Sequence, residues 1–562
     1  WIIVVFVHFQ KNNKQKNDLK MRRLKLLICG ALLFIAFTTI GYRTVSLAGL
    51  DDKTVKNSFR SVNSKNLIHP FRGNILDRNN NLLATTINIS SLNINPQEVL
   101  DVNQTILKLK KIFPKLNREK LLQKLNSNKK HVQILREISP RDHVSLLKLG
   151  IEALKIESSK KRIYPNHSLA SHVLGNTDID GKGIAGIEKK FDKVLANGGD
   201  ISISIHSGIQ HITKTLLLEQ INQFKAEGGA GIIMDAKNGE IYALVSLPDY
   251  NANNYNKLLD YKLFNKATKG TYELGSTLKL ITAAVALESD LINENEVFDV
   301  SSPLRISSRT IKDYHPLNYA ISIPEVVVHS SNIGSAKIAE KFGSSTQLKY
   351  LKSLGLMDKL SLELPELGKP QVRTDKKLLT TMTISYGHGI SITPTHLASA
   401  TATIVNNGIR VDPTLLISNS AKKNKRIFSK KTSKTMRSIM RLVVSNKNGT
   451  AKQAEASGYL VGGKTGTAEK TNPAGGYFKK QNIVTLTSAF PMNNPRFIIT
   501  VMIDNPKGSK RTAGWVAAPV VNKIVTRIAP VLNIKPQTKS SVNFSKSLLK
   551  FKIRGKDKGA IL

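Results

Sequence analysis

The chain has 562 residues, of which 40% are hydrophobic and 22% are charged. This length allows two or three domains, each with its own core, and the mixed composition excludes a protein made mainly of membrane-spanning segments. The formal net charge of +44 would suit a nucleic-acid-binding protein. However, the lysines are scattered, are not grouped with aromatic residues and accompany no nucleic-acid-binding motif. We therefore expect no nucleic-acid partner and interpret the charge as a solvated, lysine-rich surface that anionic wall polymers or lipid head groups would attract.

The first predicted element is a transmembrane anchor over residues 26–42, an apolar run of about the minimum length that spans a bilayer. Lysines and arginines precede this run, so the positive-inside rule places residues 1–25 in the cytoplasm and the following chain outside. The run is longer than the apolar part of a usual signal peptide, which favours an uncleaved anchor over a cleaved one. The chain opens with Trp1, and Met21 is a candidate for the true start.

After the anchor, the pattern predicts a linker followed by a mixed α/β domain. Residues 43–66 are polar and indicate the linker, and residues 67–215 form the expected domain. Its short strands and lysine-rich helices are expected at 92–94, 201–205, 105–113 and 118–125.

From about residue 216 the pattern changes and predicts a second domain that extends to residue 535. The turn residues at 237–239 lie between two apolar, β-like runs, which indicates a pair of antiparallel strands. The strands are expected at 231–235, 241–245, 483–488 and 496–504, and the helices at 278–287, 324–340 and 394–405. Strands, a helical middle and strands again predict an α+β fold with an antiparallel sheet against helices. Residues 536–562 are rich in lysine and serine and indicate a basic tail.

Three short motifs in the second domain carry candidate chemistry: Ser276-Thr277-Leu278-Lys279, Ser330-Ser331-Asn332 and Lys464-Thr465-Gly466-Thr467. A serine followed three residues later by lysine occurs six times in this chain, so that spacing alone proves nothing. Only Ser276 follows a glycine and opens an apolar helix. There its hydroxyl would lie at the positive end of the helix, with Lys279 one turn further on the same face.

A lysine held in a partly dry site beside another cation loses its proton readily, so Lys279 could act as a base. The alternative, in which Ser276 only caps a helix and Lys279 lies on the surface, describes most pairs with this spacing. The second motif lies between two predicted helical segments, which indicates a turn. In the third motif, Gly466 on a strand edge would let a substrate backbone approach closely, and the adjoining hydroxyls and lysine suit a carboxylate.

The three motifs in this order resemble those of penicillin-binding proteins and class A β-lactamases. Further segments resemble the class B penicillin-binding proteins, and together they cover about residues 70 to 530: 72–79, 162–165, 172–175, 186–188, 246–253, 272–279 and 386–394. Two positions depart from the family pattern. Leu278 stands where phenylalanine is usual, and Asn80 stands where glycine is usual but tolerates the same left-handed backbone.

The resemblance implies a serine β-lactamase-like transpeptidase domain on an elongated, non-catalytic pedestal. It implies that an active-site serine forms an acyl-enzyme with D-Ala–D-Ala stem peptides and passes the acyl group to an amine on a neighbouring stem, and that β-lactams acylate the same serine. The implied roles are nucleophile (Ser276), base (Lys279), proton relay (Ser330), substrate-amide orientation (Asn332), local field (Lys464), substrate and carboxylate binding (Thr465, Gly466, Thr467) and backbone oxyanion hole (Ser276, Thr467). We expect no metal and no other cofactor.

The alternatives to this hypothesis concern the residue that acts as base and the class of protein. His388 is a conceivable base, but by resemblance the base is a lysine, so we interpret His388 as structural. Arg72, Asp77, Arg162 and Glu188 are interpreted as ion-pair or turn residues of the pedestal. A β-lactamase would be about half as long and would carry a deacylating glutamate, and a class A penicillin-binding protein would need a glycosyltransferase domain. A non-catalytic β-lactam sensor or a scaffold of the division machinery remains an alternative of a different class.

Within class B, segments 461–470 and 512–519 resemble the division type, while an elongation-type enzyme remains the alternative. The division type implies a single-pass inner-membrane protein at the septum with its catalytic domain in the periplasm. It also implies a membrane-embedded glycan polymerase and other division proteins as partners.

Overall fold

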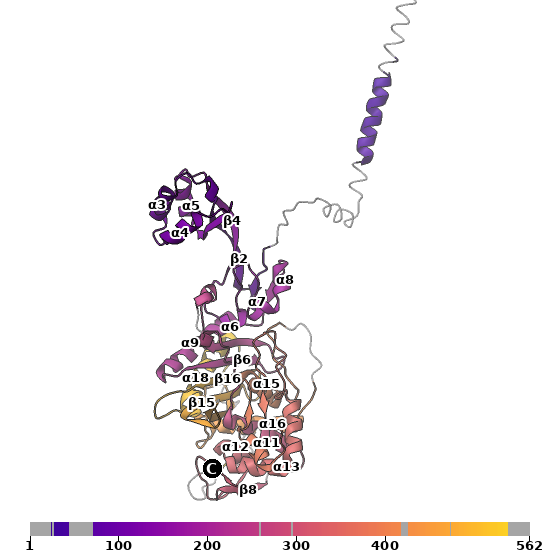
Figure 1. The fold of residues 1–562 in the computed structure, drawn as a ribbon. Helices are drawn as coiled ribbons and strands as arrows, with labels where there is room; N and C mark the ends of the chain where they lie inside the picture. The colour runs from indigo at the N-terminus through magenta and orange to yellow at the C-terminus, as the bar shows by residue number, and fades with distance from the viewer. Residues whose placement is uncertain are drawn as a thin grey trace, which may run out of the picture. The chain divides into compact units, whose positions relative to one another are not determined.

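The computed structural model describes residues 24, 27–43, 71–257, 260–293, 296–417, 425–472, 474–537 and 553 (Figure 1). Residues 27–43 are helical, but no helix within these described ranges is long and apolar enough to cross a membrane. The predicted anchor over 26–42 is therefore not confirmed. The predicted leader (1–25), linker (43–66) and basic tail (536–562) lie almost wholly outside the described residues.

The N-terminal domain is built on a long, bent antiparallel ribbon. Strand β2 (Leu82–Ile94) pairs along its length with β4 (Leu154–Ile163) and at its far end with β3 (Val132–Ile138). At its near end β2 pairs with β1 (Ile75–Leu76), which pairs in parallel with β5 (Ile201–Ser202). The ribbon carries the helices η1 (Pro96–Glu98), α3 (Val102–Ile112), α4 (Arg118–Leu125) and α5 (Pro140–Leu147).

These helices begin where the sequence supplies capping side chains. Asp101, Asn117 and Ser139 each accept a hydrogen bond from a backbone N–H in the first turn of the helix that follows. Their apolar faces meet the far end of β2 and form a small separate core that includes Ile106, Leu109 and Leu121. The helix predicted at 118–125 is confirmed as α4, and the helix predicted at 105–113 is α3, which begins three residues earlier and ends one residue earlier. The strand predicted at 92–94 is only the end of the longer β2, and the strand predicted at 201–205 is limited to the two residues of β5.

A cluster of buried ion pairs connects the segments of this domain around β1. The carboxylate of Glu188, which is fully buried, accepts hydrogen bonds at 2.7 Å from the Nε atoms of Arg72 and Arg162. Asp77 accepts from the backbone N–H groups of Asn79 and Asn81 in the adjoining turn, and Asn80 has φ +63°. The interpretation of these residues as pedestal ion-pair and turn residues is confirmed. Short helices complete the region: α6 (Ser171–Leu174), α7 (Gly186–Lys190) and α8 (Asp192–Ala196).

The C-terminal domain is built on a five-stranded antiparallel sheet in the order β14-β15-β16-β6-β7. Its strands are β6 (Gly228–Asp235), β7 (Ile241–Leu247), β14 (Gly462–Thr471), β15 (Tyr477–Phe490) and β16 (Phe497–Asp504). The predicted antiparallel sheet is confirmed, and β14, which carries the third motif, is an edge strand.

Helices cover both faces of the sheet (Figure 1). Helices α9 (Ser207–Gln223) and α18 (Ala518–Val531) pack on one face, where a Cβ at Gly231 would lie 2.9 Å from the Thr213 side chain of α9. Helix α15 (Pro394–Val405) packs on the other face, where Thr401 hydrogen-bonds Thr487 of β15. The boundary predicted at 215/216 lies inside α9, and this helix packs on the sheet of the C-terminal domain.

A helical layer beside α15 carries the first two motifs. Its elements are η3 (Gly275–Leu278), α11 (Lys279–Glu288), α12 (Ile323–His329), α13 (Asn332–Ser353), α14 (Leu378–Ser385) and α16 (Lys430–Ser445). The helix predicted over 324–340 is divided at Ser330 into α12 and α13, which confirms the turn expected at the second motif. Small elements fill the rest: η2 (Ala252–Lys257), α10 (Asp260–Leu263), β8 (Val297–Asp299), β9 (Leu304–Ile306), β10 (Arg309–Ile311), β11 (Ala320–Ser322), β12 (Gln371–Val372), β13 (Ile390–Ser391), η4 (Lys452–Ala454) and α17 (Ala513–Val516).

Candidate active site

Ser276 lies in a tight turn at the start of a buried helix. The 3-10 turn η3 leads directly into α11, whose residues from Lys279 to Ala286 are all buried. Gly275 precedes the serine with φ +54°, a left-handed backbone that glycine adopts without strain. The prediction that the first motif opens an apolar helix is confirmed, with the difference that Ser276 stands in the 3-10 turn and α11 begins at Lys279.

Lys279 lies beside the serine hydroxyl and is almost fully buried, with 1% of its surface exposed. Its Nζ is 2.7 Å from Ser276 Oγ and 2.7 Å from Asn332 Oδ1, and it donates a hydrogen bond at 3.0 Å to the Ser330 carbonyl. Burial lowers the pKa of Lys279 from 10.5 to about 7, although the negative charge of Asp313 partly opposes the shift. A buried amine that is half neutral near pH 7 can accept the proton of the adjacent hydroxyl.

The turn between α12 and α13 brings the second motif to the same point. Ser330 has φ +62° and ends α12, and Ser331 then caps α13 by accepting a hydrogen bond from the Gly334 N–H. The left-handed backbone of Ser330 is uncommon for a residue other than glycine. It orients Ser330 Oγ between two lysines, 3.4 Å from Lys279 Nζ and 2.9 Å from Lys464 Nζ. Ser330 therefore links the two amines through one hydroxyl.

Lys464 reaches the site from the edge strand β14 and is fully buried. Its Nζ donates to Ser330 Oγ and, at 2.9 Å, to the Thr465 carbonyl. Burial, and after it the positive charge of Lys279, lowers the pKa of Lys464 well below its usual value. The buried amines of Lys279 and Lys464 have only the Ser330 hydroxyl between them, so they cannot both hold a proton without a large electrostatic cost. This repulsion makes a neutral lysine available.

Two glycines allow β14 to approach the nucleophile turn. A Cβ at Gly466 would lie 2.2 Å from the Leu274 carbonyl oxygen and 2.8 Å from the Thr277 side chain. A Cβ at Gly275 would lie 2.8 Å from the Thr467 carbonyl oxygen. Gly466 thus faces the nucleophile turn, which corrects our expectation that its missing side chain makes room for the substrate backbone. Because the strand alternates, Thr465 and Thr467 face the opposite way, into the cavity.

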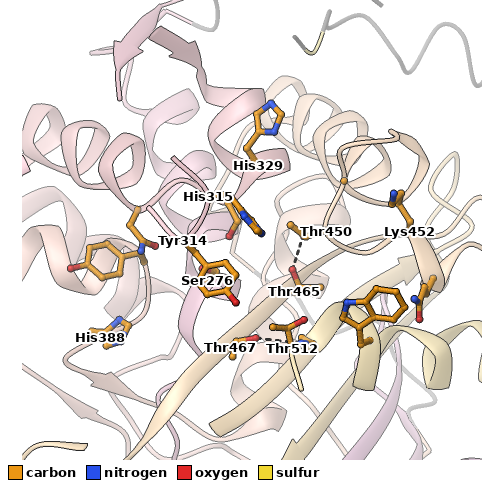
Figure 2. Close-up of a pocket in the computed structure, with 18 residues that line it drawn as sticks. Ser276, Tyr314, His315, His329, His388, Thr450, Lys452, Thr465, Thr467 and Thr512 are labelled. Carbon is orange, nitrogen blue, oxygen red and sulfur yellow. Dashed lines mark hydrogen bonds between the residues drawn. The ribbon is translucent and has the colours of Figure 1, made fainter. Parts of the chain in front are cut away.

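A cavity of about 690 Å³ opens above these residues, and Ser276, Ser330, Asn332, Thr465 and Thr467 line it (Figure 2). Lys279, Lys464 and Gly466 are not among the lining residues and lie behind its surface. All the predicted site residues are therefore brought together, either in the wall of one cavity or directly behind it. The backbone N–H groups of Ser276 and Thr467 belong to segments that touch at Gly275, but their role as an oxyanion hole stays a prediction.

Asp313 is a site residue that the sequence patterns did not reveal. Its carboxylate accepts hydrogen bonds from the backbone N–H groups of Asn332 and Ile333 and, at 2.6 Å, from Ser331 Oγ. It therefore caps α13 and orients the second motif. No local pattern marks it, since it follows β10 in a loop 18 residues before Ser331.

A second set of residues that the sequence patterns do not reveal surrounds His388, which lines the cavity together with Tyr386. Glu273 accepts hydrogen bonds from the Gly389 N–H at 2.8 Å and from the Tyr477 hydroxyl at 2.9 Å, and so joins three separate segments beside the nucleophile turn. The ring centroid of His388 is 5.8 Å from that of Tyr477, and its Nδ1 atom is buried without a hydrogen-bond partner. Burial lowers the pKa of His388, the negative charge of Glu273 opposes this shift, and the positive charge of Lys279 adds to it. A structural role for a neutral His388 ring stays our interpretation.

Among the residues that the structure describes, no group of three histidine, cysteine or carboxylate side chains could hold a metal ion. The chemistry that this arrangement offers is that of a hydroxyl nucleophile, two buried amines that can hold or release a proton, and hydroxyls that can bind an anion. The order of the motifs and their convergence at one cavity are typical of the penicillin-binding proteins and class A β-lactamases.

Comparison with known families identifies the class more closely. The model for the penicillin-binding protein transpeptidase domain matches residues 229–526, more than half of the chain, and the model for the penicillin-binding protein dimerisation domain matches residues 67–204. The chain therefore belongs to the penicillin-binding protein transpeptidase family, and within it to the class B proteins of the FtsI, or penicillin-binding protein 3, type.

Individual relatives agree with this assignment. A probable peptidoglycan D,D-transpeptidase FtsI of Caulobacter vibrioides is 33% identical over 83% of this chain and 82% of its own length. The peptidoglycan D,D-transpeptidase FtsI of Escherichia coli K12 is 27% identical over 91% of this chain and 92% of its own length. The crystal structure of penicillin-binding protein 3 from Mycobacterium tuberculosis with aztreonam shares the fold, with a TM-score of 0.67 and 24% identity over 84% of this chain and 98% of that one.

Proposed function

We propose that this protein is a peptidoglycan D,D-transpeptidase that crosslinks stem peptides through an acyl-enzyme on Ser276, and that β-lactams acylate the same residue. The observation that carries the proposal is the contact of 2.7 Å between Ser276 Oγ and the buried Nζ of Lys279, whose pKa is about 7. A surface lysine beside a helix-capping serine would be solvated and fully protonated at neutral pH, so the burial argues against that alternative.

In the acylation step, neutral Lys279 takes the proton of Ser276, and Oγ attacks the carbonyl carbon of the penultimate D-alanine. The C–O bond to Ser276 forms and the C–N bond to the terminal D-alanine breaks. Ser330, which lies between the Nζ atoms of Lys279 and Lys464, passes a proton to the departing amine. Thr465 and Thr467 bind the terminal carboxylate in the field of Lys464, and Asn332 orients the substrate amide.

In the second step, an amine of a neighbouring stem peptide attacks the acyl carbonyl. The new C–N bond forms, the C–O bond to Ser276 breaks, and the proton of the amine returns to Oγ by way of Lys279. Hydrolysis of the same acyl-enzyme by water would give a carboxypeptidase product.

The test is turnover of a peptide that ends in D-Ala–D-Ala, with release of D-alanine and formation of the crosslinked product followed by mass spectrometry. The wild-type protein is expected to give both products, and Ser276→Ala is expected to lower D-alanine release by at least about a thousandfold. Thr432→Ser, a conservative change at a buried residue of α16 away from the cavity, serves as the matched control. Wild-type levels of release by Ser276→Ala would refute the proposal.

We further propose that the enzyme acts at the division septum and is anchored in the inner membrane by residues 26–42, with a membrane-embedded glycan polymerase as partner. The support is the FtsI type of the chain and the apolar run that follows a basic segment in its sequence. A tagged copy is expected to form a mid-cell band and to resist extraction by alkaline carbonate. An even distribution along the side wall would favour the elongation-type alternative.

A further inference from the structure

The N-terminal domain contacts two loops of the C-terminal domain that lie near the nucleophile turn. Its helices α6 and α7 lie at the boundary between the two domains, where α6 contacts β7 (Figure 1). His172 of α6 donates a hydrogen bond from Nε2 to the Lys262 carbonyl oxygen at 2.9 Å. The backbone N–H of Gly186, the first residue of α7, points at the carboxylate of Glu366 and lies 3.4 and 3.3 Å from its two oxygen atoms.

The two loops meet at Thr268, which is fully buried. Its backbone N–H donates a hydrogen bond at 3.2 Å to the side-chain oxygen of Asn265, which lies on the same loop as Lys262. Its Oγ1 donates at 2.7 Å to the backbone carbonyl of Glu366, and its own carbonyl accepts at 2.9 Å from the Gly368 N–H. The backbone and the hydroxyl of Thr268 therefore bind both of the loops that the N-terminal domain contacts.

The chain from Thr268 to the nucleophile turn is closely packed. Ser276 follows Thr268 by eight residues. A Cβ at Gly368 would lie 2.3 Å from the Lys269 carbonyl oxygen, so the second loop is in direct backbone contact with this stretch. Tyr272 then exchanges two backbone hydrogen bonds with the residue that follows β13. A shift of Thr268 therefore has little slack to absorb it before it reaches the serine.

The position of the serine is what the reaction depends on. Ser276 Oγ must stay within hydrogen-bond distance of Lys279 Nζ, which is 2.7 Å away, and a misplacement of about 1 Å lowers a catalytic rate by roughly a hundredfold. Thr268 is not among the residues that line the cavity, and neither is any described residue of the N-terminal domain. An effect of these residues on the reaction must therefore act through the nucleophile turn.

We propose that Thr268 is a positioning residue for acylation. It fixes the chain before Ser276 to two loops that the N-terminal domain holds, so that the rate of acylation depends on the contact that His172 makes with the first loop. This inference rests on the proposed acylation of Ser276. It gives the N-terminal domain a defined path to the active site, through a buried residue with a discrete set of hydrogen bonds.

The experiment compares two changes at Thr268 in the full-length protein. Thr268→Val removes the hydroxyl and keeps the shape of the side chain, whereas Thr268→Ser keeps the hydroxyl. The rate of covalent labelling by a fluorescent penicillin is measured, together with the melting temperature and with kcat and KM for a thioester of an N-acylated D-alanine. We expect Thr268→Val to label about thirtyfold more slowly, with kcat lowered and KM changed by less than about twofold, and Thr268→Ser to restore most of the rate.

Thr213→Val is the matched control, because Thr213 is also fully buried and its hydroxyl also donates to a backbone carbonyl, that of Ile209 within α9. It is expected to label at the wild-type rate. An equal loss of rate in Thr213→Val and Thr268→Val would show that lost stability explains the effect, and would overturn the inference. So would a folded Thr268→Val that labels at the wild-type rate.

A double-mutant cycle tests the path from the N-terminal domain. His172→Ala alone is expected to slow labelling about fivefold, but to slow it by less than about twofold further in Thr268→Val, because the path is already broken there. Fully independent losses would overturn the inference, and if Thr268→Val does not fold, labelling of His172→Ala at the wild-type rate would overturn it instead. These outcomes leave the proposed function standing, whereas a wild-type protein that takes no covalent label would refute both.

Discussion

The close approach of β14 to the nucleophile turn makes Gly466→Ala the most informative single change. The new Cβ would lie 2.2 Å from the Leu274 carbonyl oxygen and 3.2 Å from the Thr277 backbone nitrogen, atoms that belong to backbone and cannot rotate away. An ordinary contact between a carbon and an oxygen atom requires roughly 1 Å more than the shorter of these distances. The strand and the turn must therefore separate by about that amount, which moves Lys464 and Thr465 relative to Ser276.

The expected cost falls mainly on catalysis. A displacement of about 1 Å in a catalytic arrangement lowers the rate by roughly a hundredfold, which corresponds to about 2.7 kcal/mol in the activation barrier. Overpacking in a well-packed region costs about 1–3 kcal/mol of folding stability, so the protein is expected to remain folded. Gly208→Ala is the matched control, since its Cβ would meet only the movable ring of His206, at 3.3 Å.

The assay follows the rate of covalent labelling by a fluorescent penicillin under pseudo-first-order conditions, together with the melting temperature of each variant. Gly466→Ala is expected to label about a hundredfold more slowly than the wild-type protein, and Gly208→Ala at the wild-type rate. Labelling of Gly466→Ala at the wild-type rate would show that the separation of β14 from the turn does not control the reaction, and would refute the reasoning.

Three further predictions concern charge. The rate of penicillin labelling is expected to rise about tenfold per pH unit below pH 7 and to level off above pH 7. The reason is that the reaction needs the neutral form of Lys279, whose pKa is about 7. A flat pH profile between pH 5.5 and 8.5 would exclude that lysine as the base. Asp313→Asn is expected to shift the midpoint of this pH profile to lower pH, because the Asp313 carboxylate stabilises the ammonium form of Lys279. The same change is expected to slow labelling about tenfold, because the backbone N–H of Asn332 loses the carboxylate that it binds. An upward shift would contradict the assigned sign. Glu188→Ala is expected to destabilise the protein by about 3–5 kcal/mol, since it leaves Arg72 and Arg162 buried without that carboxylate, and an unchanged melting temperature would show that the cluster contributes nothing.

The elements that sequence reasoning located well are those with a strong local pattern. Helices α4 and α15 were predicted with the bounds that the structure gives, since lysine-rich and apolar periodicities and a Pro at the start mark them clearly. The three motifs were placed at a helix start, a turn between helices and an edge strand because the residues around each one carry those local signals. Their convergence in one cavity followed from the family resemblance and not from the patterns alone.

Other features of the site depend on contacts between residues that lie far apart in the sequence. Glu273 and Tyr477 are 204 residues apart, and nothing near either residue indicates the other. The local pattern around Gly466 does not predict its packing for the same reason, since the turn that its missing side chain accommodates lies almost two hundred residues earlier. Asp313 acts through a helix N-terminus that only the folded chain brings to it.

The central claim is that Ser276 is the residue that becomes acylated. The direct measurement is to incubate the full-length protein with benzylpenicillin, digest it, and locate the penicilloyl group by tandem mass spectrometry. We predict one stoichiometric adduct, on the Ser276 hydroxyl, and none in Ser276→Ala. An adduct on any other residue of the wild-type protein, or covalent labelling that persists in Ser276→Ala, would contradict the account.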